Sequence, residues 1–181
     1  MKIRRVVAGT GVDGKSQVLM DGPVPRSVEF QSAPGMAAAL VWAAQVGGSI
    51  PRGDEIVDRS AAATFVPNIG ESLLEITTFP PDSSMMREDF DPAALGEEFA
   101  RLLPGLAETL EPEHPGMHRT DSVDFCVVLE GEITLELDDG KEVLLRKHDV
   151  VIQNGNRHAW RNKSDQPVTM LFVLTGITRS S

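Results

Sequence analysis

From residue 120 onward, short apolar segments alternate with turn residues, and this pattern limits the possible folds more than any other feature of the chain. The segments of strand length are VDFCVVLEG, EITLELDDG, KEVLLRK, DVVIQNG, RHAWRN and PVTMLFVLTG. Closely spaced short strands with turn residues between them are typical of antiparallel sandwiches and barrels. Asp139-Gly140 also predicts a tight hairpin between two of the strands.

The first part of the chain continues the β pattern. Further strand-length segments lie at residues 2–9, 16–22, 27–31, 37–44 and 71–80, whereas residues 46–70 are rich in turn residues and are predicted to form a surface loop. The length of 181 residues and the hydrophobic fraction of 41% suit one globular domain with a core. We therefore predict an all-β fold.

Residues 91–113 follow a helical pattern instead. Asp91 can cap the helix, Pro92 suits its first position, and apolar side chains recur at helical spacing. Pro104 lacks an amide hydrogen, so it should divide or kink the helix. Two roles remain open: packing against the barrel or a subunit partner, or a lid over the barrel mouth, because the segment ends shortly before His118.

Charge and composition argue against several classes of partner. The chain has 17 Lys and Arg against 27 Asp and Glu, and the net charge of -10 repels nucleic acid and anionic membranes. The longest apolar run, residues 36–46, is about half the ~20 residues of a membrane span, and the start lacks the hydrophobic stretch of a secretory signal. A single cysteine, Cys126, allows no internal disulfide. We predict a cytoplasmic protein.

Residues 118–133, HRTDSVDFCVVLEGEI, place polar groups at the start of a segment that otherwise belongs in a core. In an extended strand, alternate side chains share one face. The side chains that share the polar face are His118, Thr120, Ser122, Asp124 and Cys126. We interpret this face as a candidate site.

Two blocks of this region resemble the two motifs of the cupin superfamily. In the first block, His118-x-Thr120-x3-Asp124-x6-Gly131 stands where cupins usually have His, His, Glu and Gly. The second block runs from Asp149 to Asn162; it has Gln153 where the family usually has Pro, followed by Gly155, His158 and Asn162. The resemblance covers residues 71–80 and 118–175, and it implies a double-stranded β-helix barrel.

The resemblance also implies how the chain is divided. Residues 1–181 would form a single cupin domain, with additional N-terminal strands in residues 1–45, a helical insertion in residues 83–113 and the core motifs in residues 114–175. Barrels of this type expose strand edges, and the N-terminal strands exceed what one small barrel needs. We therefore predict a homodimer in which residues 1–45 form the contact.

His118, Asp124 and His158 are the predicted metal ligands. Two imidazoles and a carboxylate suit a divalent ion such as iron, zinc, manganese or nickel, and they leave coordination positions open. The even separation of His118 and Asp124 keeps them on one face. Thr120 is a poor ligand where the family usually has a second imidazole, so the alternative is a metal-free barrel that binds its ligand through hydrogen bonds alone.

Further side chains near these positions are candidates for other roles. Thr120 and Asp121 are placed for hydrogen bonding or proton transfer, and His114 or Asp121 could replace the missing metal ligand if the backbone bends. The candidates for binding an organic ligand are Cys126, Trp160, Asn162 and Arg157. Against these roles, a lone cysteine in a strand is more often a small buried hydrophobe, and tryptophan is as often a packing residue.

Two functional classes follow. The first is an enzyme in which a divalent metal assists decarboxylation, isomerisation or oxygen-dependent cleavage of a small molecule of the carboxylate, carbonyl or enol type. The second is a metal-free module that binds or senses a small molecule without chemistry. Fold analogy cannot decide between them, because one fold supports many functions. In both classes the partner is a small organic ligand, not a nucleic acid or a membrane.

Overall fold

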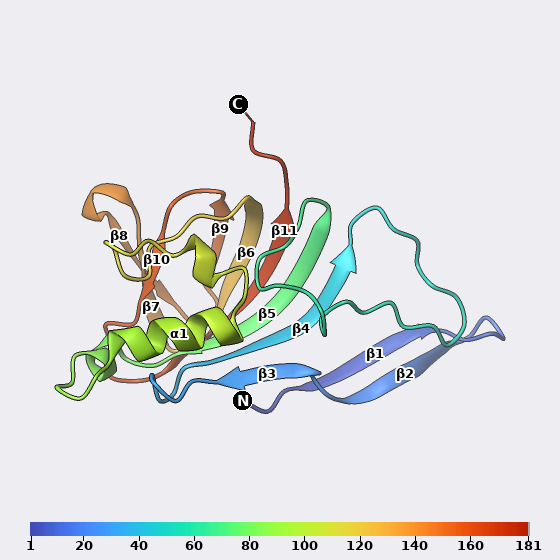
Figure 1. Ribbon diagram of the computed structural model, residues 1–181. Helices are drawn as coiled ribbons and strands as arrows, with labels where there is room; N and C mark the ends of the chain where they lie inside the picture. The colour runs from blue at the N-terminus through green and yellow to red at the C-terminus, as the bar shows by residue number, and fades with distance from the viewer. Residues whose placement is uncertain (181) are drawn as a thin grey trace.

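The computed structural model describes residues 1–180, and their fold is all-β, as predicted (Figure 1). The strands are β1 (Arg4–Thr10), β2 (Ser16–Pro23), β3 (Arg26–Glu29), β4 (Ala37–Gln45), β5 (Glu71–Phe79), β6 (Ser122–Glu130), β7 (Glu132–Glu136), β8 (Glu142–Arg146), β9 (Val150–Asn154), β10 (Ala159–Arg161) and β11 (Val168–Gly176). The helices are α1 (Pro92–Leu102) and the short 3-10 helices η1 (Asp82–Met85), η2 (Ala107–Thr109) and η3 (Asp138–Gly140). Each segment predicted to be a strand contains one.

Two antiparallel sheets enclose the barrel. One has the strand order β3-β4-β5-β11-β6-β9 and the other the order β10-β7-β8. Their inward side chains meet in one apolar cluster, which includes Cys126, Val128 and Phe172 from the first sheet and Ile133 and Leu145 from the second. The topology is that of a double-stranded β-helix.

The hairpin between β7 and β8 forms at the predicted residues. Asp139 and Gly140 both have positive φ, at 59° and 68°, which a tight turn between twisted strands requires. Leu137 and Lys141 close the turn through a backbone hydrogen bond of 2.8 Å. The pairing of β7 with β8 then follows directly.

Helix α1 begins and ends where the sequence indicates. The Asp91 carboxylate accepts hydrogen bonds from the backbone amides of Ala93 and Ala94 at 2.9 and 3.1 Å, and Pro92 is the first helical residue. The helix stops at Leu102, two residues before Pro104, so the proline ends the helix and does not kink it.

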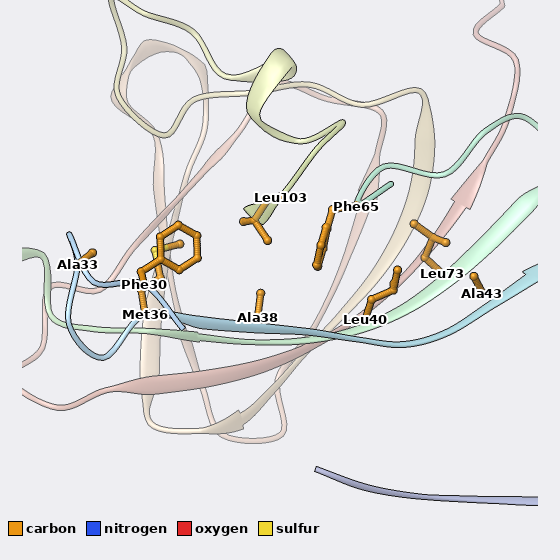
Figure 2. Close-up of a cluster of buried hydrophobic side chains, with 9 residues drawn as sticks. All are labelled: Phe30, Ala33, Met36, Ala38, Leu40, Ala43, Phe65, Leu73 and Leu103. Atoms are coloured by element: carbon orange, nitrogen blue, oxygen red, sulfur yellow. The ribbon is translucent and has the colours of Figure 1, made fainter. Parts of the chain in front are cut away.

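The helical segment packs against the large sheet. Phe99 of α1 lies with its ring centroid 4.9 Å from that of Phe30, and the Glu98 carboxylate accepts the backbone amide hydrogen of Ser32 at 2.8 Å. Leu103 completes the buried cluster on the sheet, which Figure 2 shows. The sequence left open whether this segment packs against the barrel or forms a lid, and the observed contacts are those of packing.

The loop before β5 also lies over the large sheet. Its Phe65 side chain is fully buried, and the Arg26 guanidinium of β3 stacks 4.6 Å from the centre of that ring. The same guanidinium donates hydrogen bonds to the carbonyl oxygens of Ala63, at 2.5 Å, and Leu102, at 3.4 Å. One side chain thus joins the loop and the end of α1 to the sheet.

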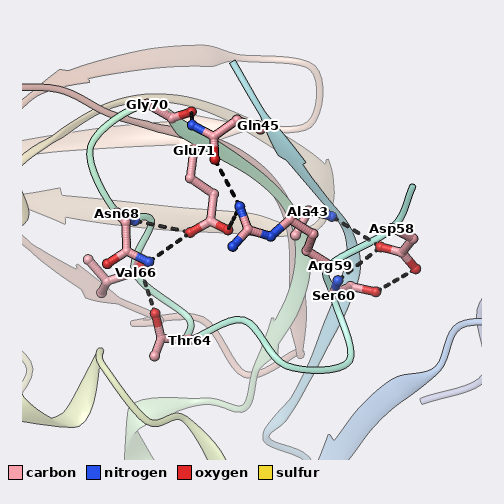
Figure 3. Close-up of polar contacts among 10 residues, drawn as sticks. All are labelled: Ala43, Gln45, Asp58, Arg59, Ser60, Thr64, Val66, Asn68, Gly70 and Glu71. Atoms are coloured by element: carbon pink, nitrogen blue, oxygen red, sulfur yellow. Dashed lines mark hydrogen bonds and ion pairs between the residues drawn. The ribbon is translucent and has the colours of Figure 1, made fainter. Parts of the chain in front are cut away.

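A polar network fixes the rest of this loop (Figure 3). The Asp58 carboxylate accepts the amide and hydroxyl hydrogens of Ser60 at 2.9 and 2.8 Å, and Arg59 donates to the side chain of Gln45 at 2.8 Å. The loop predicted from its turn residues is therefore present, but side-chain hydrogen bonds hold it in place.

No helix within residues 1–180 is long and apolar enough to cross a membrane. The outer face of β6 and β9 is nevertheless apolar and open. The exposed fractions are 46% for Phe125, 61% for Val150 and 52% for Ile152. Strand β9 also lies at the edge of its sheet.

The homodimer through residues 1–45 stays a prediction. We expect this open face of β6 and β9 to be a second surface that joins two copies of the chain, because exposed strand edges and apolar patches favour association. Replacing Phe125 and Ile152 together with Lys should convert a dimer into a monomer of 19.6 kDa in sedimentation velocity at micromolar concentration. Met86→Lys is the control, because Met86 is exposed between η1 and α1, outside residues 1–45 and outside β6 and β9. A wild-type chain that sediments at 19.6 kDa would contradict the homodimer.

Candidate functional site

Two histidines meet inside the barrel through their backbones. His118 and His158 exchange a pair of backbone N–H to carbonyl hydrogen bonds, both of 3.0 Å. Their ring centroids lie 4.3 Å apart at an angle of 50°. His158 is buried and His118 is half-buried. The structure therefore brings together two of the three side chains that the sequence predicts as metal ligands.

The hydrogen bonds of the two rings determine which nitrogen is available. Nδ1 of His118 lies 3.1 Å from the carbonyl oxygen of Gly116, and Nδ1 of His158 lies 3.1 Å from that of Asn156. A carbonyl oxygen only accepts, so each Nδ1 carries the hydrogen and each Nε2 keeps a lone pair. Burial lowers the pKa of both rings, that of His158 to about 4 with a further contribution from His118. Both imidazoles are neutral near pH 7.

A second polar group lies on the inward face of the large sheet. Asp124 of β6 stands directly opposite Gln153 of β9, and Glu75 comes from β5. The three side chains are only 5%, 2% and 6% exposed. Burial raises the pKa of Asp124 to about 6; burial, and then the nearby Asp124 charge, raise the pKa of Glu75 well above its usual value.

Sequence reasoning missed Glu75 and gave Gln153 no role. A signal for Glu75 was present, because β5 alternates between inward and outward residues, and Glu75 occupies an inward position between Leu73 and Thr77. Gln153 stood out only as a departure from the usual proline of the cupin motif.

The third predicted metal ligand does not join the histidines. Within residues 1–180, no group of three or more His, Cys, Asp or Glu side chains is placed to hold a metal ion. Asp124 lies opposite Gln153 in the pairing of β6 with β9. The Thr120 hydroxyl is 2.8 Å from that of Ser122. The side chains present offer two imidazole ligands, and this does not fit a complete metal site.

Several of the other predicted site residues take part in contacts within the protein. Asp121 is exposed and forms an ion pair with Arg179 at 2.8 Å. Arg157 donates to Glu111 through Nε and Nη2, at 2.7 and 2.6 Å, and to Asp138 through Nη1 at 2.8 Å. This side chain joins the segment before His118 to the β7–β8 turn.

The remaining candidates are buried or partly buried. The Asn162 amide donates to the carbonyl oxygens of Phe79 and Gln166 at 3.0 and 2.8 Å. Cys126 lies in the apolar cluster, where burial raises the pKa of its thiol, so it stays protonated. The Trp160 ring packs edge-on against His158 at 5.6 Å and Phe172 at 5.9 Å between centroids.

A surface cleft lies elsewhere. It has a volume of about 320 Å³ and is bordered by His114, Met117, Arg157 and Arg161, between residues 113–117 and the β7–β8 turn. Neither histidine of the pair and none of the three buried polar residues lines it. The histidine pair and the buried polar group are the candidate site, because the chemistry of a site depends on its functional groups and not on the volume of a cleft.

Comparison with known proteins agrees with this architecture. Residues 106–174 match the family described as Cupin domain. Phomopsin biosynthesis cluster protein C' of Diaporthe leptostromiformis is 54% identical over 48 residues, which cover 26% of this chain and 25% of that protein. A cupin-domain-containing oxidoreductase of Neurospora crassa is 44% identical over 62 residues, 34% of this chain and 32% of that protein. The matches thus span about a quarter to a third of these relatives.

Among solved structures, a putative ethanolamine utilization protein Q from Salmonella typhimurium aligns over 98% of this chain and 99% of its own, with a TM-score of 0.42 and 10% identity. The matched segment, residues 106–174, includes β6 to β10 and most of β11, together with both histidines of the pair. The similarity to the cupin domain family is therefore a match of residues 106–174 and not of the whole chain.

Proposed function

We propose that this protein binds a small organic molecule of the carbonyl, carboxylate or enol type and that the His118–His158 pair transfers protons to and from it. The observation that supports this proposal is the pair itself. Two neutral imidazoles are in contact, and each Nδ1 is bound to a carbonyl oxygen. Each Nε2 is therefore a proton acceptor near neutral pH.

The two rings have different roles in this proposal. His118 is half-buried, and the Glu111 carboxylate favours its charged form, so His118 is the base that takes the proton. Its Nδ1–H bond to the Gly116 carbonyl keeps the ring oriented while the charge develops. His158, whose pKa is about 4, stays neutral and accepts a hydrogen bond from the ligand through Nε2. Such a proton transfer fits an isomerisation or a decarboxylation.

The relatives named cupin-domain-containing oxidoreductases support a second candidate, an enzymatic role with redox chemistry. The two Nε2 lone pairs are suitable donors for iron, zinc, manganese or nickel. Two protein ligands are fewer than catalytic zinc sites normally provide, so we assign no step to a metal.

Proton transfer can be tested by deuterium exchange. Small 2-oxo acids and 1,3-diketones are incubated with the protein in D₂O, and loss of the α-proton signal is followed by NMR. We expect exchange above the buffer rate, and His118→Ala should slow it by about 100-fold, the lower end of what a positioned base contributes. His148→Asn is the control, because His148 is an exposed turn residue with φ of 75°, which Asn tolerates.

The outcome is read against both variants. Slower exchange in His118→Ala and unchanged exchange in His148→Asn support the proposal. If none of the probes exchanges faster than in buffer, or if both variants behave like the wild type, the His118–His158 pair is not a proton-transfer site.

A further inference from the structure

The buried polar group formed by Glu75, Asp124 and Gln153 has no role in the proton transfer proposed above. The three side chains come from three strands of the large sheet, β5, β6 and β9. Asp124 and Gln153 face each other across neighbouring strands, and β11 lies between β5 and β6. All three are more than nine-tenths buried. Segments distant in sequence therefore bring two carboxyl groups and one amide to the same inward face.

Each of these side chains has a polar atom without a partner. Glu75 Oε1, Asp124 Oδ1 and Gln153 Nε2 are buried and make no hydrogen bond within residues 1–180. Leaving a buried donor or acceptor unpaired destabilises the fold, so such groups are rare unless something else binds them. Asp124 and Gln153 could have bonded to each other across the strands, yet Asp124 Oδ1 and Gln153 Nε2 both remain unpaired.

The donor or acceptor character of the unpaired atoms determines which ligand group could form hydrogen bonds with all of them. Carboxyl oxygens accept hydrogen bonds, and the Gln153 amide nitrogen donates them. A group that only donates, such as an ammonium, would leave Gln153 unpaired. A group that only accepts, such as a carboxylate, would face two acidic side chains. A group that both donates and accepts matches the set.

The charges nearby agree with a neutral ligand group. The Arg26 guanidinium is close enough to favour the charged form of Glu75, so a positive charge already lies on this side of the sheet. Arg26 itself is held by the Ala63 and Leu102 carbonyls and by the Phe65 ring. It therefore stays beside Glu75 without forming a hydrogen bond to it.

Two of the three residues are also departures from the usual cupin motif. Asp124 stands in place of Glu, and Gln153 in place of Pro. In the structure these two departures are direct cross-strand partners. A proline at residue 153 would have no side-chain donor, so the Gln153 amide gives this chain an unpaired donor that the usual motif lacks.

We infer that Glu75, Asp124 and Gln153 form a subsite that binds a hydroxyl or carboxamide group of a neutral organic ligand. The ligand group donates to a carboxyl oxygen of Glu75 or Asp124 and accepts from Gln153 Nε2. The inference deepens the proposed function, on which it rests for the presence of a ligand in the barrel, by naming a polar group that this ligand carries.

The test measures binding alone. The full chain, labelled with ¹⁵N, is titrated with formamide and with methanol, which represent the carboxamide and the hydroxyl, and with methylammonium and acetate, which only donate and only accept. We expect one or both neutral probes to shift the backbone amide signals of Asp124 and Gln153 and the side-chain NH₂ signal of Gln153. Whichever of the two binds more tightly identifies the ligand group.

Variants locate the binding. Glu75→Leu and Gln153→Leu should each weaken binding of the neutral probe at least tenfold. Thr77→Val, the next inward position on β5, should leave it unchanged. If Glu75→Leu does not fold, the nearly isosteric Glu75→Gln replaces it and should weaken binding at least threefold, because one acceptor becomes a donor.

Three results would overturn the inference: no shift with any probe, which means that water alone satisfies these atoms; shifts with methylammonium or acetate only; or equal loss of binding in Thr77→Val. Formamide and methanol have no proton α to a carbonyl group on carbon, so they do not depend on the His118–His158 chemistry. Failure here leaves the deuterium-exchange result standing, and failure of that exchange leaves this binding result standing.

Discussion

Asp124→Asn is expected to raise the free energy of unfolding at pH 8 by about 2–3 kcal/mol. The carboxyl group is 5% exposed, and burial raises its pKa to about 6 from a usual value of 3.8. Such a shift corresponds to about 3 kcal/mol of preference for the neutral form. The wild-type chain must bury a charge above pH 6, whereas the amide of the variant carries none.

The pH dependence of stability shows in which direction Asp124 changes the free energy of unfolding. A group whose pKa is higher in the folded chain stabilises the fold fully below its unfolded pKa, and this contribution is lost as the pH rises through the folded pKa. For Asp124 the loss falls between about pH 4 and pH 6. His158, with its pKa lowered to about 4, has the opposite slope between about pH 4 and 6.5. The advantage of Asp124→Asn should therefore appear between pH 4 and pH 6.

Urea unfolding at pH 4, 6 and 8, followed by tryptophan fluorescence, measures this effect. Asp121→Asn is the matched control, because Asp121 is exposed and its ion pair with Arg179 is worth less than about 1 kcal/mol. If Asp124→Asn changes stability equally at pH 4 and pH 8, the Asp124 carboxylate is not buried as a charge.

Thr120→His is expected to create a zinc site. Thr120 is buried, lies two residues after His118 in the chain, and occupies the position at which cupins usually have a second histidine. A third imidazole beside the His118–His158 pair would supply the three protein ligands of catalytic zinc sites. Outer-shell partners of a metal change its affinity by up to ~100-fold. A direct ligand contributes more, so we expect zinc affinity to rise by more than this amount.

Calorimetric titration at pH 7.5 measures this gain. Thr120→Asn is the control for the lost hydroxyl contact with Ser122, and Thr120→His combined with His158→Ala should lose the gain again. Equal zinc binding by Thr120→His and Thr120→Asn would show that position 120 does not face the histidine pair.

Local patterns in the sequence were sufficient to predict much of the fold. Asp91-Pro92 and Asp139-Gly140 act through their own backbone and nearest neighbours, so the start of α1 and the β7–β8 turn were predictable. The inward direction of Asp124 was also predictable, because the side-chain period of a strand is two.

The contacts that build the candidate sites depend on barrel closure. Glu75 and Asp124 lie on β5 and β6 with β11 between them, and nothing local indicates that they share one interior. The partners of Arg157, namely Glu111 and Asp138, were equally unpredictable, because many acidic residues are available and only the fold selects two. The role of Arg157 in binding an organic ligand stays a prediction, and the structure adds its two acidic partners.

The backbone pairing of His118 with His158 has a consequence for protein design. Both hydrogen bonds involve only main-chain atoms, so any residue other than proline at these two positions keeps their donors and acceptors. A library that varies residues 118 and 158 together would keep a fixed spacing between two inward side chains. Nucleophiles, thiols or unnatural metal-chelating amino acids could be introduced there in pairs, with the barrel as an unchanged scaffold.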